Sequence, residues 1–297
     1  MSESDYLVKG ITKNGSFRAI AVSTKNLTEE ARQRHNLSHT SAVALGRSMA
    51  CGILLCYTLR KTKGHLTLKI KGEGPIGSII VDASSEGTVR GYVDRPEIEC
   101  FDQKGLVDID KAVGKTGYVH VSYDNEKGIP YKSSVEIVSG EIAKDVVNYL
   151  ATSEQIASFI SCGVYLEPSS GKVIHSGGIL IQTMPNASDD DIKKTEETVT
   201  KLDPFSILLR SGLNLEQILK KSLIDHGVEI LSEFEGLCFY CGCSRKKFES
   251  ALISLGKIEI KNIINTVGYA EGRCNFCSNV YMFKKEELED LTNKTKD

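Results

Sequence analysis

The sequence lacks an excess of charge of either sign. Its 297 residues include 37 Lys and Arg against 39 Asp and Glu, and the sequence pI is near 6.3. Proteins that are drawn to phosphate backbones or anionic membranes by their overall electric field carry a clear positive excess. We therefore expect neither a nucleic-acid partner nor a membrane partner.

The sequence also lacks an export signal and a long apolar run. The first residues, MSESDY, contain no basic stretch followed by an apolar core. No uninterrupted apolar run approaches the roughly 18 residues that span a bilayer. We expect a cytoplasmic protein. Apolar residues still make up 40% of the chain, which is enough for one large core or for two to three smaller units.

Motifs of nucleotide enzymes are present only in fragments. The sequence GEGPIG at residues 72–77 fits G-x-G-x-x-G, but residues 78–82 have the pattern of a strand where the fingerprint requires a helix. GKT at residues 114–116 resembles the end of a P-loop, yet Ile109 occupies the position of its first glycine. The six histidines lack the H-E-x-x-H spacing, and we interpret them as structural or surface residues. We expect no enzyme and no catalytic residues.

Residues 6–182 show the patterns of an α+β domain. Residues 66–71 alternate apolar and polar side chains, and residues 77–82 and 88–93 repeat the alternation across a short turn. This pattern predicts a β-meander. Helices that would cover the sheet are predicted at residues 41–61 and 140–150.

The composition changes between residues 188 and 236. This stretch has 11 acidic and 6 basic residues, a net charge of about −5 from 6 − 11. Leu215, Ile218 and Leu219 recur at helical spacing, and Asn214 begins a plausible helix cap. A helix with a thin apolar stripe and acidic repulsion depends for its order on the surface that it docks on.

These patterns predict three parts. Residues 1–185 form an α+β core domain, residues 186–236 a metastable helical linker, and residues 237–297 a small C-terminal domain. The last part contains an amphipathic run at residues 246–255 and a charged helix from Lys284. Sixty residues make a small core, so a metal that stabilises this domain is physically reasonable.

Cysteine usage carries the clearest functional signal. In a chain without an export signal, cysteines are interpreted as thiols or metal ligands. Five of the nine fall within the last 60 residues: Cys238, Cys241, Cys243, Cys274 and Cys277. A C-x-C pair and a C-x-x-C pair about thirty residues apart can bring four sulfurs to the corners of a tetrahedron, which suits zinc. Gly242 permits the sharp backbone that a C-x-C ligand pair requires. Cys238 and Cys241 could also form a C-x-x-C knuckle, so spacing alone leaves the ligand set open.

The C-x-C pair differs chemically from an ordinary zinc knuckle. A disulfide closed across a single residue is strained, and strained disulfides are the easily reduced, regulatory kind. Zinc also holds the sulfurs as thiolates, the form that attacks peroxide. A reversible redox switch would exploit both properties.

With these motifs, the sequence resembles the heat-shock protein 33 family of redox-regulated holdase chaperones. The C-terminal signature of that family is C-x-C, about thirty residues, then C-x-x-C, and Cys241, Cys243, Cys274 and Cys277 fall on it. The resemblance extends over nearly the whole chain. Further matching blocks are TSAVALGRS (40–48), GEGPIG (72–77), VRGYV (89–93), SEQI (153–156) and GGILIQTMP (177–185).

The resemblance implies an ATP-independent chaperone that holds one Zn²⁺ per chain and is inactive when reduced. Oxidation would form the disulfides Cys241 to Cys243 and Cys274 to Cys277, release zinc and unfold the C-terminal part. The surfaces so exposed would bind unfolding client proteins, usually as a homodimer. The core domain at residues 1–185 would then carry dimerisation and client binding.

The remaining cysteines depart from this pattern. Cys238 could displace Cys243 as a ligand or capture Cys241 in a C-x-x-C disulfide, although we expect it to be a bystander. The four scattered cysteines lack such neighbours in the sequence and are predicted to be small buried apolar residues. They are Cys51, Cys56, Cys100 and Cys162.

Two other functions fit part of the pattern. A zinc-ribbon module that binds nucleic acid would need a basic footprint, whereas residues 237–297 carry ten basic and eight acidic residues. A thiol-disulfide oxidoreductase would need its C-x-x-C at a helix N-terminus, whereas the strand-like residues 280–283 follow Cys277.

Overall fold

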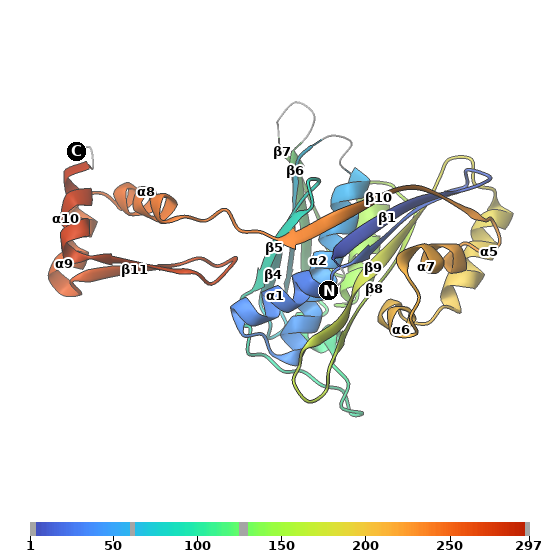
Figure 1. The fold of residues 1–297 in the computed structure, drawn as a ribbon, viewed down its shortest axis with the longest axis horizontal. Coiled ribbons are helices and arrows are strands. Elements are labelled where there is room, and N and C mark those ends of the chain that lie inside the picture. The colour runs from blue at the N-terminus through green and yellow to red at the C-terminus, as the bar shows by residue number, and fades with distance from the viewer. Residues whose placement is uncertain (1–3, 60–62, 125–129, 295–297) are drawn as a thin grey trace. The chain divides into compact units, whose positions relative to one another are not determined.

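The structure is a computed structural model that describes residues 4–59, 63–124 and 130–294. The chain forms two compact units, the N-terminal unit (Met1–Tyr240) and the C-terminal unit (Cys241–Asp297). The N-terminal unit contains a ten-stranded sheet in the order β7-β6-β3-β4-β5-β10-β1-β2-β9-β8 (Figure 1). Its strands are β1 (Asp5–Thr12), β2 (Phe17–Ser23), β3 (His65–Gly72), β4 (Ser78–Ser84), β5 (Thr88–Val93), β6 (Gly117–Asp124), β7 (Pro130–Glu136), β8 (Ser158–Leu166), β9 (Val173–Thr183) and β10 (Val228–Phe239).

The predicted β-meander is confirmed as β3, β4 and β5, which pair antiparallel. Along β3 the alternate side chains Leu66, Leu68 and Ile70 are fully buried, as the period of two predicts. The β5–β10 pair is parallel and short, with Cys238 opposite Thr88 in its register. This pair joins the meander to the other half of the sheet.

In the described part of the N-terminal unit, seven helices pack around this sheet. They are α1 (Lys25–His35), α2 (His39–Leu59), α3 (Ile109–Val113), α4 (Ile142–Thr152), α5 (Asp189–Thr200), α6 (Phe205–Arg210) and α7 (Leu215–Ser222). The two helices predicted at residues 41–61 and 140–150 are confirmed as α2 and α4, except that residues 60–61 lie outside the described part.

Helix α2 is the central core helix. Of its 21 residues, 17 are buried, and it packs on β4, β8 and β9. By length and composition alone it could cross a membrane. Arg47 interrupts its apolar sequence and forms an ion pair with Glu141 at 2.7 Å. Burial inside the unit accounts for the apolar character of α2.

The strands β1, β2 and β9 bury side chains on both faces. Leu7 and Val22 join the core that contains α2, whereas their neighbours Val8 and Ala21 join a second core beneath α5, α6 and α7. Successive side chains of a strand point to opposite faces, so this half of the sheet is covered on both sides. Adjacent apolar residues such as Leu7 and Val8 in β1, and residues 19–22 in β2, reflect this burial on both faces.

Residues 186–236, which the sequence predicts to be a helical linker, contain the helices α5, α6 and α7. The end of this segment is a strand and not a helix. The cap that begins α7 is confirmed, since Asn214 accepts a hydrogen bond from the backbone N–H of Gln217 at 2.9 Å. Residues 228–239, however, form the strand β10, which pairs with β1 along most of its length. Most β10 side chains are exposed or half-buried, so neither the period of a strand nor that of a helix dominates its sequence.

The glycine motif at residues 72–77 serves close packing. A Cβ atom on Gly72 would lie 1.9 Å from the carbonyl oxygen of Val113, and one on Gly74 would lie 2.3 Å from that of Ala112. Only glycine allows β3 and the turn after it to approach the end of α3 so closely. As predicted, strands follow both motifs, β4 after Gly77 and β6 after Gly114.

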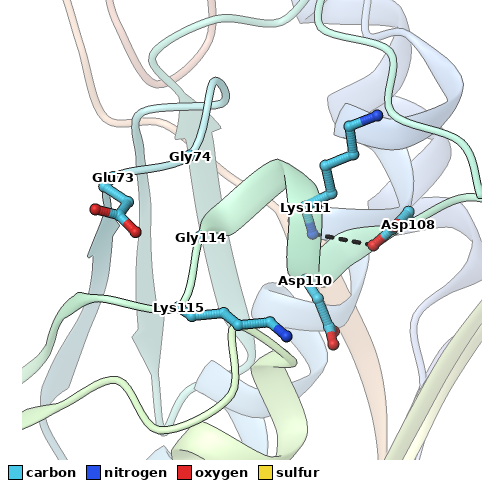
Figure 2. A pocket seen from close by; sticks show the side chains of 7 residues that line it. All are labelled: Glu73, Gly74, Asp108, Asp110, Lys111, Gly114 and Lys115. Atoms are coloured by element: carbon cyan, nitrogen blue, oxygen red, sulfur yellow. Dashed lines mark hydrogen bonds between the residues drawn. The ribbon is translucent and has the colours of Figure 1, made fainter.

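An open cavity of about 540 Å³ lies beside this contact. Figure 2 shows the side chains that line it, among them three carboxylates, Glu73, Asp108 and Asp110. Asp108 accepts a hydrogen bond from the backbone N–H of Lys111 at 3.0 Å and so caps α3. Lys111 and Lys115 also line the cavity, so its charges are mixed rather than arranged to hold a phosphate.

Candidate metal centre

The C-terminal unit has a small core of its own. Its elements are α8 (Arg245–Leu255), α9 (Lys257–Thr266), β11 (Tyr269–Arg273), β12 (Val280–Lys284) and α10 (Lys285–Lys294). The strands β11 and β12 form an antiparallel hairpin. The buried residues of this core are Ile260, Ala270, Phe283, Leu288 and Leu291. So few buried side chains provide little stability to a unit of this size.

Two tight backbone segments present the four predicted cysteines. Cys274 and Cys277 lie in the turn between β11 and β12, where the backbone N–H of Cys274 donates to the carbonyl of Asn279 at 2.9 Å. The turn also places Ser278 at a φ of 59°. Cys241 and Cys243 lie directly before α8, at the start of the unit.

The fold brings all four sulfurs into one group, within 4.8 Å of one another. The Sγ atoms of Cys241 and Cys274 are 3.7 Å apart, and those of Cys243 and Cys277 are 3.3 Å apart. Tetrahedral zinc with bonds of about 2.3 Å separates its sulfur ligands by about 3.8 Å. The donor type, number and spacing therefore fit a zinc ion.

Burial raises the pKa values of the Cys274 and Cys277 thiols above their usual range, and neighbouring thiols add to the effect at Cys277. Thiols in such a setting stay protonated unless a cation offsets the cost of the thiolate charges. A bound divalent ion would supply that compensation and hold the sulfurs in their nucleophilic form.

A fifth side chain reaches the cluster and was missed by sequence reasoning. The hydroxyl of Tyr281, on β12, lies 3.1 Å from the Sγ of Cys243. The alternation of the strand could have shown that Tyr281 shares a face with Phe283, since side chains two residues apart point the same way. Nothing local connects that face to Cys243.

The other cysteines lie in the N-terminal unit. Cys238 is exposed on β10 and is not one of the four grouped thiols. The prediction of buried positions is confirmed for Cys51, Cys56 and Cys100, whereas Cys162 is only partly buried.

Comparison with known proteins agrees with this arrangement. A model of the family described as "Hsp33 protein" matches residues 5–284. The chain belongs to the Hsp33 family. A relative from Nostoc punctiforme, named 33 kDa chaperonin, is 43% identical over 97% of this chain and 96% of its own length. The 33 kDa chaperonin of Synechocystis is 42% identical, with the same coverage.

The Hsp33 fold is also seen in a solved structure. The crystal structure of the 33 kDa chaperonin of Thermotoga maritima, a heat shock protein 33 homolog, matches with a TM-score of 0.90 and 32% identity. The match covers 98% of both chains. Membership of the Hsp33 family supports a chaperone function, which is not a class of enzyme.

Proposed function

We propose that this Hsp33-family chaperone is a holdase switched by oxidation of a zinc centre. The reduced protein holds one Zn²⁺ through Cys241, Cys243, Cys274 and Cys277 and is inactive. Oxidation expels the ion and activates the protein. The observation that carries the proposal is the grouping of four cysteine sulfurs within 4.8 Å in a unit with a small core, with no His, Asp or Glu of the described residues in the group.

The oxidation step requires a two-electron oxidant for each sulfur pair. One peroxide takes two electrons from a pair of thiolates and two protons from the solvent, which gives one disulfide and two waters. We propose the pairs Cys241 to Cys243 and Cys274 to Cys277. The sulfurs of the alternative pairs, across the two motifs, lie 3.7 Å and 3.3 Å apart. The local pairs close very short loops, however, so they persist when the two motifs separate.

Loss of zinc removes most of what stabilises the C-terminal unit. Metal binding by small zinc units contributes roughly 10 to 16 kcal/mol of apparent folding free energy. That is comparable to the whole stability of a typical domain, about 5 to 15 kcal/mol. A core of five buried residues does not replace it, so the C-terminal unit unfolds.

We further propose that residues 186–236 are the metastable part that follows. Phe205, Leu215 and Leu219 are fully buried, and they pack on one face of the sheet. The order of these helices depends on that contact, because α6 and α7 have only 6 and 8 residues. The strand β10 ends at Phe239, two residues before Cys241, so unfolding of the zinc unit reaches this segment through the chain.

Release of this segment would expose two apolar surfaces, its own stripe and the sheet face that it covers. Apolar surface of this kind binds unfolded chains without sequence specificity and without ATP. We propose that the core domain at residues 1–185 then binds clients, as a homodimer, in the cytoplasm.

One experiment tests the switch. Zinc content and suppression of client aggregation are measured on the same sample before and after peroxide treatment at mild heat, and again after reduction by a thiol. The proposal expects one zinc and no activity, then no zinc and full activity, then reversal. Equal activity of the reduced and oxidised forms would refute the switch but not the chaperone.

A further inference from the structure

A second pair of thiols lies inside the N-terminal unit. The Sγ of Cys51, on α2, is 3.8 Å from the Sγ of Cys162, on β8. The two residues are 111 positions apart in the sequence. A disulfide bond is about 2.05 Å long, so the sulfurs must approach by less than 2 Å.

The surroundings of the two thiols differ. Cys51 is fully buried, and its contact with Cys162 together with burial raises its pKa above the usual range. Cys162 is only partly buried, so a small oxidant can reach it. Gly178 lies opposite Cys162 on β9, and a Cβ atom there would be 3.1 Å from the Cβ of Cys162. The glycine leaves room beside Cys162 for its side chain to turn.

We propose that Cys51 and Cys162 are a second redox-active pair, which oxidation joins in a disulfide between α2 and β8. Peroxide first converts the Cys162 thiol to a sulfenic acid and releases one water. The Cys51 sulfur then attacks the Cys162 sulfur, and the hydroxyl leaves with the Cys51 proton as a second water. Two thiols and one peroxide thus give one disulfide and two waters.

The position of the pair indicates what the bond does. β8 is the last strand at one end of the sheet, and the side chain of Cys162 faces the core that contains α2. The next residue, Gly163, belongs to the opposite face, where a Cβ atom would lie 2.7 Å from the Oγ of Ser206 on α6. If α6 departs on oxidation, which rests on the proposed function, β8 loses the helix on that face. The disulfide keeps β8 attached through the other face.

The test uses the full-length, zinc-loaded protein. It is oxidised with hydrogen peroxide at mild heat, its free thiols are alkylated under denaturing conditions, and peptides are analysed without reduction. We expect a cross-linked pair that contains Cys51 and Cys162 and is two hydrogens lighter than the sum of the reduced peptides. Cys162→Ser abolishes it. Cys56→Ser, a matched change of another buried thiol on α2, leaves it intact.

The melting temperature is a second measurement, which does not depend on the cross-linked peptide. Closing a loop of this length stabilises a folded unit. Oxidised wild-type protein should therefore melt several degrees above oxidised Cys162→Ser and oxidised Cys51→Ala. Recovery of both thiols in the free form would overturn the proposal, as would a Cys162 sulfinic acid beside a free Cys51. Mass spectrometry detects the cross-link directly. The result therefore tests this proposal even if oxidation fails to activate the chaperone.

Discussion

The phenolic hydroxyl of Tyr281 forms a hydrogen bond with the sulfur of Cys243, 3.1 Å away. The ring of Tyr281 stacks on Phe248 of α8 with a centroid distance of 4.7 Å, which fixes the direction of the hydroxyl. The pKa of Tyr281 is raised, chiefly by this hydrogen bond, so the phenol remains a donor. A donor to a ligand sulfur orients the ligand and stabilises its negative charge.

Tyr281→Phe should weaken the proposed zinc site while preserving the ring and its stacking. Loss of such an outer-shell partner typically lowers metal affinity by about 10- to 100-fold. We expect faster zinc transfer to a chromogenic chelator and faster zinc release by peroxide. Tyr269→Phe, on the neighbouring strand β11, is the control and should behave as wild type. If zinc release is equally fast from Tyr281→Phe and Tyr269→Phe, the hydroxyl of Tyr281 does not support the zinc site and the residue acts only through packing of its ring.

Each of the four grouped cysteines should be required for zinc, and Cys238 should not. Cys274→Ser replaces a thiolate by a hydroxyl, which is a poor zinc ligand, and should reduce bound zinc well below one ion per chain. Cys238→Ser should retain one ion, because Cys238 is exposed on β10 and is not one of the four grouped sulfurs. Elemental analysis decides the point. An equal loss at Cys238 would overturn the ligand assignment.

Local patterns predicted the parts of the fold that depend on neighbours in the sequence. The alternation at residues 66–71, the cap at Asn214 and the apolar run in α2 all appear as expected. The grouping of four cysteine sulfurs was predictable for the same reason. C-x-C and C-x-x-C each confine two sulfurs to one turn. A single long-range contact between the two turns is then enough to bring all four sulfurs together.

The features that sequence patterns did not predict all depend on contacts between residues that are far apart in the sequence. β10 is a strand because β1, more than 200 residues earlier, pairs with it. Its own exposed and acidic sequence favours no period. The contacts of Tyr281 with Cys243 and of Cys51 with Cys162 likewise arise from packing, and no spacing rule connects residues 111 positions apart.

The contribution of Asp5 to the stability of the N-terminal unit should fall as the pH rises from about 4 to about 6. Asp5 is almost fully buried and caps α1 by accepting hydrogen bonds from the backbone N–H groups of Asn26 and Leu27. Burial outweighs these bonds and raises the pKa of Asp5 from 3.8 to about 6. The folded state thus holds the proton more tightly than the unfolded state. Ionisation of Asp5, which is complete above about pH 7, lowers the free energy of unfolding by roughly 3 kcal/mol, of which about 2 kcal/mol is lost between pH 4 and pH 6.

The variant Asp5→Asn does not ionise, so its stability lacks this pH dependence. Its amide keeps one oxygen that accepts a backbone N–H and loses the second acceptor, which is a cost that does not change with pH. Denaturant unfolding of both proteins between pH 4 and 7 gives a difference that cancels the other carboxylates. The stability of the variant relative to wild type should rise between pH 4 and pH 7, because only wild type ionises at this position. A difference that is independent of pH would show that Asp5 stays ionised throughout.

Leu219→Ala should activate the chaperone without oxidation. Leu219 is fully buried on α7, in the core between residues 186–236 and the sheet. Its truncation leaves a cavity and costs about 2 to 5 kcal/mol of stability. If this segment is the metastable part, that loss shifts it toward release while zinc stays bound. The reduced variant should then suppress client aggregation.

The matched control is Ile224→Ala, two residues beyond the end of α7. Ile224 is 68% exposed, so its truncation changes stability by about 0.5 kcal/mol or less. Hydrogen exchange on both reduced variants should show lost protection at residues 186–236 only for Leu219→Ala. If Leu219→Ala loses that protection, retains its zinc and still fails to hold client, release of this segment is not the activating step. Activity would then arise from unfolding of the C-terminal unit itself.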